Sequence, residues 1–131
     1  EFYLAVPPKH PLTRFKKVDQ HLLRKHKLLL LEEGHCLRDQ ALEVCRLHGL
    51  NEELDFKATG METLRQMVKA GTGITFVPRV AMQADEPDIR YLPFEAPAPT
   101  RTIGLVWRKT SARTHVIDQL LKDLSLIQPT D

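Results

Sequence analysis

Short apolar runs recur along the chain, and most of them end at proline or glycine. Residues 2–6 alternate weakly and stop at Pro7, which indicates a strand closed by a residue that cannot donate a ladder hydrogen bond. The run from Leu28 to Leu31 is wholly apolar and has charged residues on both sides, the pattern of a strand buried on both faces of a sheet. The same reasoning predicts further strands at residues 55–59, 73–78, 89–92 and 102–107.

Segments with the helical spacing of apolar residues lie between these strands. Asp19 is placed to cap a short helix through Lys25, and Thr59 and Glu62 have the spacing of a capping box that would start another. Strands that alternate with helices predict an α/β fold, with a mixed sheet and helices on both of its faces. The next predicted helix covers residues 34–49 and ends at Gly49. Another follows Thr59, carries an apolar stripe of Leu64, Met67 and Val68, and ends at Gly71. The last covers residues 111–127.

The proline-rich residues 93–99 divide the chain into two parts. Residues 1–100 contain most of the predicted sheet, and we expect them to form one lobe. One strand and one helix cannot make a lobe by themselves, so residues 101–131 are expected to belong to another lobe. Because residue 1 stands next to the middle of a predicted strand, we expect a fragment of a longer protein, in which residues 1–100 form the second lobe with both cysteines and the first lobe, to which residues 101–131 belong, is incomplete.

The composition is ordinary for a soluble globular protein, with 131 residues, 42% hydrophobic and 27% charged. No apolar run approaches the ~18 residues of a membrane span, and no signal-peptide pattern opens the chain. Two cysteines without such a signal favour a reducing compartment, and we expect a cytoplasmic protein. The net charge of +2 does not indicate a nucleic-acid surface. We interpret an uneven basic stretch as a solvated face; it holds Lys9, Arg14, Lys16, Lys17, Arg24, Lys25 and Lys27 against the single acid Asp19.

The two cysteines, Cys36 and Cys45, lie nine residues apart in the helix predicted over residues 34–49. Nine residues of helix span about 13 Å and place the two thiols on opposite faces. A disulfide needs Cα atoms within about 7 Å, so this pair can bond only if the helix unwinds. Such a bond would make the segment a two-state switch.

Cys36 also has the surroundings of a reactive thiol. It stands in the first turn of its helix, where unpaired backbone N–H groups favour an anion. His35 is adjacent and Arg38 is two residues on, and cationic neighbours raise the thiolate fraction at neutral pH. Attack of a thiolate on a peroxide gives a sulfenic acid, which condenses with a second thiol, and Cys45 is the second thiol in this chain.

The residues alone leave other interpretations open. The cysteines could be small buried apolar residues without chemistry. His35, Cys36, Cys45 and His48 are zinc-ligand types, although their positions on the helix do not converge and we expect no metal. The chain has no serine-histidine-aspartate or phosphate-loop pattern, and the lone Gly71-Thr72-Gly73 turn carries little weight. A domain that senses a small metabolite and a thiol peroxidase enzyme remain as rival functions, and we favour a protein that is not an enzyme.

Several segments resemble the peroxide-sensing regulators of the LysR type. The run from Gly34 to Ala41, which reads G-H-C-L-R-D-Q-A, followed by Cys45 resembles their redox segment and is the most specific match. The glycine-x-glycine-isoleucine motif at residues 71–74, which leads into the predicted strand at residues 73–78, is typical of LysR-type effector domains in general. Weaker similarities lie at residues 58–65, 67–75 and 101–106.

The resemblance implies a periplasmic-binding-protein-like effector domain of two lobes, without the N-terminal helix-turn-helix that binds DNA. It implies that Cys36 is the peroxidatic thiol and Cys45 its resolving partner, with no metal and no cofactor. Gly34, His35, Asp39 and Arg101 would hold and polarise the peroxide. Asp55 and Phe94 depart from the residues expected at their positions, so the resemblance assigns them no role.

The function implied is that hydrogen peroxide joins Cys36 to Cys45 reversibly and refolds the segment. The refolding would change the packing of a homodimer or homotetramer and so its binding to DNA. A thiol reductant such as glutaredoxin would restore the dithiol, and RNA polymerase would be the partner of the intact activator. No membrane partner is implied.

Overall fold

The computed structural model describes residues 1–32, 38–43, 57–83, 85–110 and 113–126. Glu1–Arg101 and Thr102–Asp131 form two separate compact units. Among these described residues, every strand lies in the first unit, and the second unit contains the helix α3, over Thr114–Leu126.

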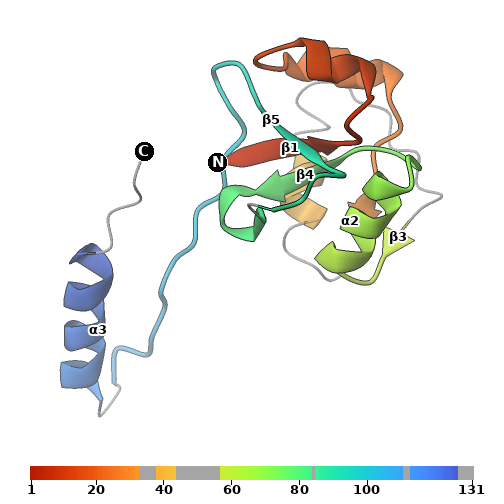
Figure 1. The fold of residues 1–131 in the computed structure, drawn as a ribbon. Coiled ribbons are helices and arrows are strands. Elements are labelled where there is room, and N and C mark those ends of the chain that lie inside the picture. The colour runs from red at the N-terminus through yellow and green to blue at the C-terminus, as the bar shows by residue number, and fades with distance from the viewer. Residues whose placement is uncertain (33–37, 44–56, 84, 111–112, 127–131) are drawn as a thin grey trace. The chain divides into compact units, whose positions relative to one another are not determined.

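Two groups of strands build the sheet of the first unit. β1 (Phe2–Val6) lies between β4 (Thr75–Pro78) and β5 (Arg90–Pro93) and is antiparallel to both (Figure 1). β2 (Leu30–Leu31) runs parallel to β3 (Lys57–Ala58). The two groups are joined next to β2, where Leu29 N donates to Ile74 O at 2.8 Å and Ile74 N donates to Lys27 O at 3.0 Å. The arrangement confirms the predicted mixed sheet.

Side chains alternate between two apolar clusters, one on each face of the sheet. Leu28 and Leu30 point into the first cluster with Leu4 and Phe76, and Leu29 and Leu31 point into the second. Neighbouring residues of a strand face opposite ways, so a run of four leucines fills both clusters at once. The prediction of a strand buried on both faces is confirmed, although ladder pairing is limited to Leu30–Leu31.

Each cluster has its own helical cover. α2 (Met61–Lys69) packs Leu64 and Val68 against the second cluster, as its apolar stripe predicts. The first cluster is covered by η1 (Pro11–Arg14), by η2 (Gln20–Lys25), and by Ala41 from the helical residues 38–43. Helices therefore lie on both faces of the sheet, as expected.

Two glycines at the end of α2 are required by the backbone. Gly71 has a φ of +77°, and its N–H donates to Val68 O while Thr72 N donates to Met67 O, the two bonds of a Schellman motif. A Cβ on Gly73 would lie 2.8 Å from Lys27 O. Gly71 thus ends the helix as predicted, and Gly73 lets β4 approach the strand beside it.

The capping box predicted at Thr59 and Glu62 is wrong. Gly60 is the N-cap residue and makes no side-chain bond. The helix begins one residue later than predicted, so Thr63 and not Glu62 occupies the third helical position. The Glu62 carboxylate is instead used inside the helix, where it accepts from Arg65 and Gln66.

The strand predicted at residues 102–107 is also not formed. Residues 101–108 carry no strand pairing with any described part of the chain, and Ile103 and Val106 are 72% and 91% exposed. An apolar run becomes a strand only when a neighbouring strand accepts and donates its ladder hydrogen bonds. After β4 the chain forms η3 (Arg79–Ala81), a short 3-10 turn that the sequence did not predict.

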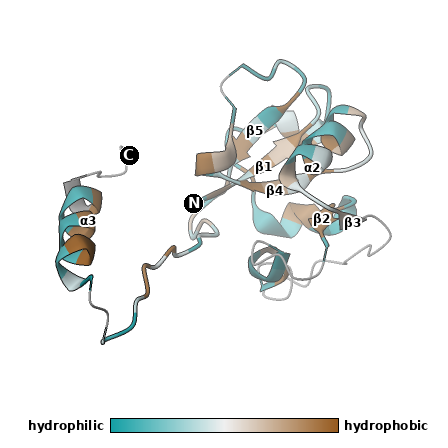
Figure 2. Cartoon of the chain, turned by 90° about the horizontal axis from the view of Figure 1, so that it is seen from below, coloured by the Kyte–Doolittle hydropathy of each residue, from teal (hydrophilic) through white to brown (hydrophobic). Residues whose placement is uncertain are grey.

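In the second unit α3 is amphipathic, as predicted. Its apolar residues form a brown band along one side of the helix, with hydrophilic residues opposite (Figure 2). The band has no cover within its own unit among the residues described. Its exposed members are Val116, Leu120, Leu121 and Leu124.

Two histidines pack together where η1 and η2 meet. The ring centroids of His10 and His26 are 4.7 Å apart, and His10 Nδ1 accepts from Leu12 N at 3.3 Å as the N-cap of η1. Partial burial lowers the pKa of both side chains, and the charge of His26 lowers the pKa of His10 further. Protonation of His10 would also place a proton on the nitrogen that caps the helix.

We expect acid to destabilise the fold through this pair. Because both pKa values are lower in the folded chain than the ~6.5 of the unfolded chain, the unfolded chain binds protons first as the pH falls. The contribution is complete above pH ~6.5 and is lost as the pH falls from there through the folded pKa values. Urea unfolding from pH 7.5 to 5 should show less loss for His10→Asn, which keeps a capping side chain. His115→Gln, in α3, is the control and should follow the unmodified protein.

Candidate functional site

The predicted redox segment is described only in part. Cys36, Cys45, His35 and Gly34 lie outside the described residues, as does the histidine His48 of the zinc alternative. The described portion is the helical residues 38–43, which begin two residues after Cys36. Residues 38–43 make the described contacts between the redox segment and the sheet.

Arg38 attaches this helix to the end of β2. Its side chain is buried, and Nη1 donates to Leu31 O at 3.2 Å. Three residues on, Ala41 is buried in the first apolar cluster. The space that borders Arg38, lined also by Leu64 and Phe76, measures about 10 Å³, the lower limit of what a water molecule needs. Arg38 is therefore part of the packed interior, a role that its proximity to Cys36 in sequence did not indicate.

Asp39 and Arg101 are the two other candidates that the structure describes. Asp39 is exposed on the helical residues 38–43, and Arg101 is half-buried as the last residue of the first unit. Among the described residues no hydrogen bond or ion pair joins the two. Their role at a peroxide pocket stays a prediction.

Phe94 belongs to the core and not to a chemical site. It is 4% exposed, and its ring centroid lies 5.6 Å from that of Phe76 in the first apolar cluster. Asp55, the other departure from the expected pattern, lies outside the described residues.

Within the described ranges, no three histidine, cysteine, aspartate or glutamate side chains come close enough to hold a metal ion. None of the helices described there is long and apolar enough to cross a bilayer.

The chain matches the family of LysR substrate-binding domains over residues 1–125. It belongs to that family. This LysR domain is 44% identical over 119 residues to the Escherichia coli K12 protein named DNA-binding transcriptional dual regulator OxyR. The match covers 89% of this chain and 39% of that protein. The chain thus spans about two fifths of the length of the curated relatives it matches.

The LysR domain is also similar to solved structures in both redox states. It superposes on the reduced form of OxyR with a TM-score of 0.80 and 41% identity, over 92% of this chain and 57% of that one. For the oxidised form the TM-score is 0.77 with 43% identity, over 92% of this chain and 58% of that one. The folded frame described above is therefore similar to that of a regulator in both states.

Proposed function

We propose that this chain is part of the regulatory domain of a transcription regulator that senses hydrogen peroxide. The observation that carries the proposal is the similarity to OxyR: 44% identity to the Escherichia coli protein, and 41% and 43% identity to the solved structures of a reduced and an oxidised form of OxyR. The G-H-C-L-R-D-Q segment with Cys45 nine residues after Cys36 supplies the chemistry such a sensor requires.

In the proposed reaction the Cys36 thiolate attacks one peroxide oxygen, the O–O bond breaks, and the other oxygen leaves as water. The Cys45 sulfur then attacks the Cys36 sulfenic acid, and a second water leaves as the disulfide forms. Two thiols are oxidised and one peroxide is reduced to two waters. Each event consumes the dithiol until a thiol reductant such as glutaredoxin restores it, so the chemistry is signalling and not turnover.

Around the sulfur, Gly34, His35, Asp39 and Arg101 are proposed to bind and polarise the peroxide. Arg101 supplies a fixed cation, and Asp39 lies three residues after Cys36 in the sequence. The described structure supports an energetic cost for disulfide formation, because helical residues 38–43 are held through the bond from Arg38 to Leu31 O, and this bond is proposed to break when Cys36 moves toward Cys45.

Residues 1–100 are proposed as the second lobe of the effector domain, and residues 101–131 as a piece of the first. The exposed apolar band of α3 and the unpaired residues 101–108 support this division, since both need partners that the described residues do not supply. In the whole protein, refolding would alter the packing of a homotetramer in the cytoplasm. That packing would act on DNA through a helix-turn-helix domain and on RNA polymerase.

Mass spectrometry of the peroxide-treated protein tests the proposal. Micromolar hydrogen peroxide should produce a peptide pair joined through Cys36 and Cys45, with a loss of two hydrogen masses that dithiothreitol reverses. Free thiols on both residues after this treatment would refute the proposed sensor.

A further inference from the structure

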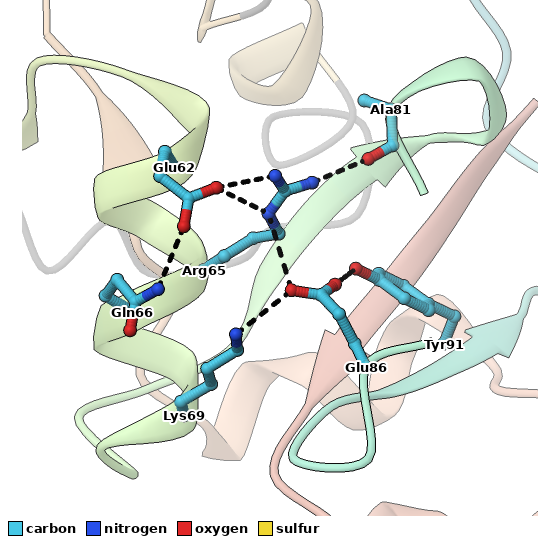
Figure 3. A network of polar contacts seen from close by, with 7 residues as sticks. All are labelled: Glu62, Arg65, Gln66, Lys69, Ala81, Glu86 and Tyr91. Carbon is cyan, nitrogen blue, oxygen red and sulfur yellow. Dashed lines mark hydrogen bonds and ion pairs between the residues drawn. The ribbon is translucent and has the colours of Figure 1, made fainter. Parts of the chain in front are cut away.

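A buried carboxylate fastens α2 to the strands beyond it. The Glu86 side chain is 5% exposed, and one of its oxygens lies 3.2 Å from Lys69 Nζ and 3.7 Å from Arg65 Nε (Figure 3). Its other oxygen accepts a hydrogen bond from the Tyr91 hydroxyl. Glu86 thus joins two cations of α2 to β5.

Arg65 adds a second attachment from the same helix. Its side chain is 9% exposed, and Nη1 donates to Ala81 O at 2.9 Å, in the turn after β4 (Figure 3). On its own helix it is held by Glu62 Oε2, at 2.6 Å from Nη2. Burial and the bond to Glu86 raise the pKa of Tyr91 to about 12, so this hydroxyl donates throughout the neutral range. We call Arg65, Lys69, Glu86 and Tyr91 the polar clamp.

The polar clamp holds a helix that lies next to the redox segment in sequence. β3 ends at Ala58, and α2 begins at Met61. Any rearrangement that starts around Cys45 therefore reaches α2 through β3. The partners of α2 in the polar clamp, Glu86 and Tyr91, come after β4 in the chain and belong to the side of the sheet made by the antiparallel strands. Among the described residues, no part of the redox segment pairs with those strands.

We infer that the polar clamp is the boundary at which the redox rearrangement stops. It holds α2 on the antiparallel strands in both redox states, so refolding after disulfide formation is confined to residues before α2. Arg65 and Glu86 act as positioning residues. The near-equal superposition on reduced and oxidised OxyR supports a frame that both states share. The inference rests on the proposed function.

The polar clamp should matter more in the oxidised protein than in the reduced one. In the reduced state α2 is also held through β3 and its parallel pairing with β2. In the oxidised state the segment that includes β3 is refolded, so the attachment of α2 to the sheet depends more on the polar clamp. Hydrogen-exchange mass spectrometry of the intact protein should show peptides over residues 61–69 and 85–93 equally protected in both states. For Glu86→Gln, exchange of α2 amides should rise at least tenfold more in the oxidised than in the reduced protein.

Milder and matched variants complete the test. Tyr91→Phe removes one hydrogen bond and should show the same bias toward the oxidised state with a smaller amplitude. Gln66→Ala, on the exposed side of α2, removes a bond to Glu62 without touching Glu86, and should change exchange equally in both states. An equal effect of Glu86→Gln in both states, or loss of α2 protection on oxidation of the unmodified protein, would overturn the inference. Disulfide formation measured in the same samples tests the proposed function separately.

Discussion

Replacing Cys36 with serine is expected to abolish the response to hydrogen peroxide completely. A serine hydroxyl is not ionised at neutral pH and cannot be oxidised to a sulfenic acid, so no later step can occur. In the intact regulator, peroxide-dependent transcription of a reporter should fall to the untreated level. The Cys36→Ser protein should still fold, because serine is close to cysteine in size.

The matched variant Cys45→Ser separates oxidation from disulfide formation. It should accumulate Cys36 sulfenic acid after peroxide, which a dimedone adduct would reveal by mass, yet form no intramolecular disulfide. A regulator that senses a metabolite through its cleft would keep its response in both variants. That outcome would leave the cysteines without function.

Replacing Arg38 with methionine should shift the equilibrium between dithiol and disulfide toward the disulfide. The substitution removes the bond from the buried guanidinium to Leu31 O but keeps an apolar side chain of similar length. Hydrogen bonds from charged groups contribute about 1.5–3 kcal/mol. Because the bond requires helical residues 38–43, its loss destabilises the dithiol state and not the disulfide state. At 30 mV per 1.4 kcal/mol, the reduction potential should become more negative by about 30–60 mV.

A redox titration of the intact protein against dithiothreitol, read by thiol alkylation and mass spectrometry, measures this shift. Arg38→Lys keeps a charge and a donor, so its potential should move less than that of the methionine variant. Unfolding in urea should show the reduced methionine variant to be less stable than the unmodified protein. A lower stability with an unchanged potential would mean that Arg38 is attached equally in both states.

The strands were predictable because alternation and apolar runs reflect local burial. The four leucines from Leu28 to Leu31 carried the information that both faces of the sheet are covered, and the two apolar clusters confirm it. Gly71 ended its helix as predicted, because a left-handed residue is a local requirement. The family was also recognisable from the segment that begins at Gly34, since its residue types and spacing are unusual.

Other features needed the tertiary structure. The capping box was predicted with Thr59 as the N-cap residue, but the N-cap is Gly60, one residue later. The T-x-x-E spacing alone does not fix the residue at which the helix begins. The polar clamp could not be seen in the sequence, since Lys69 and Glu86 are far apart along the chain and their attraction exists only where the fold excludes water. The sequence placed Arg38 two residues from the Cys36 thiol, and only the structure shows that its guanidinium donates to Leu31 O.

By itself the sequence determined where most of the strands lie along the chain, the burial of both sheet faces and the family, because each depends on residue types at short spacing. Only the tertiary structure decided that residues 102–107 form no strand, that Arg38 is an interior attachment and that Glu86 holds α2. Strand pairing and buried ion pairs need a partner from elsewhere in the chain, and the position of that partner is a property of the folded molecule.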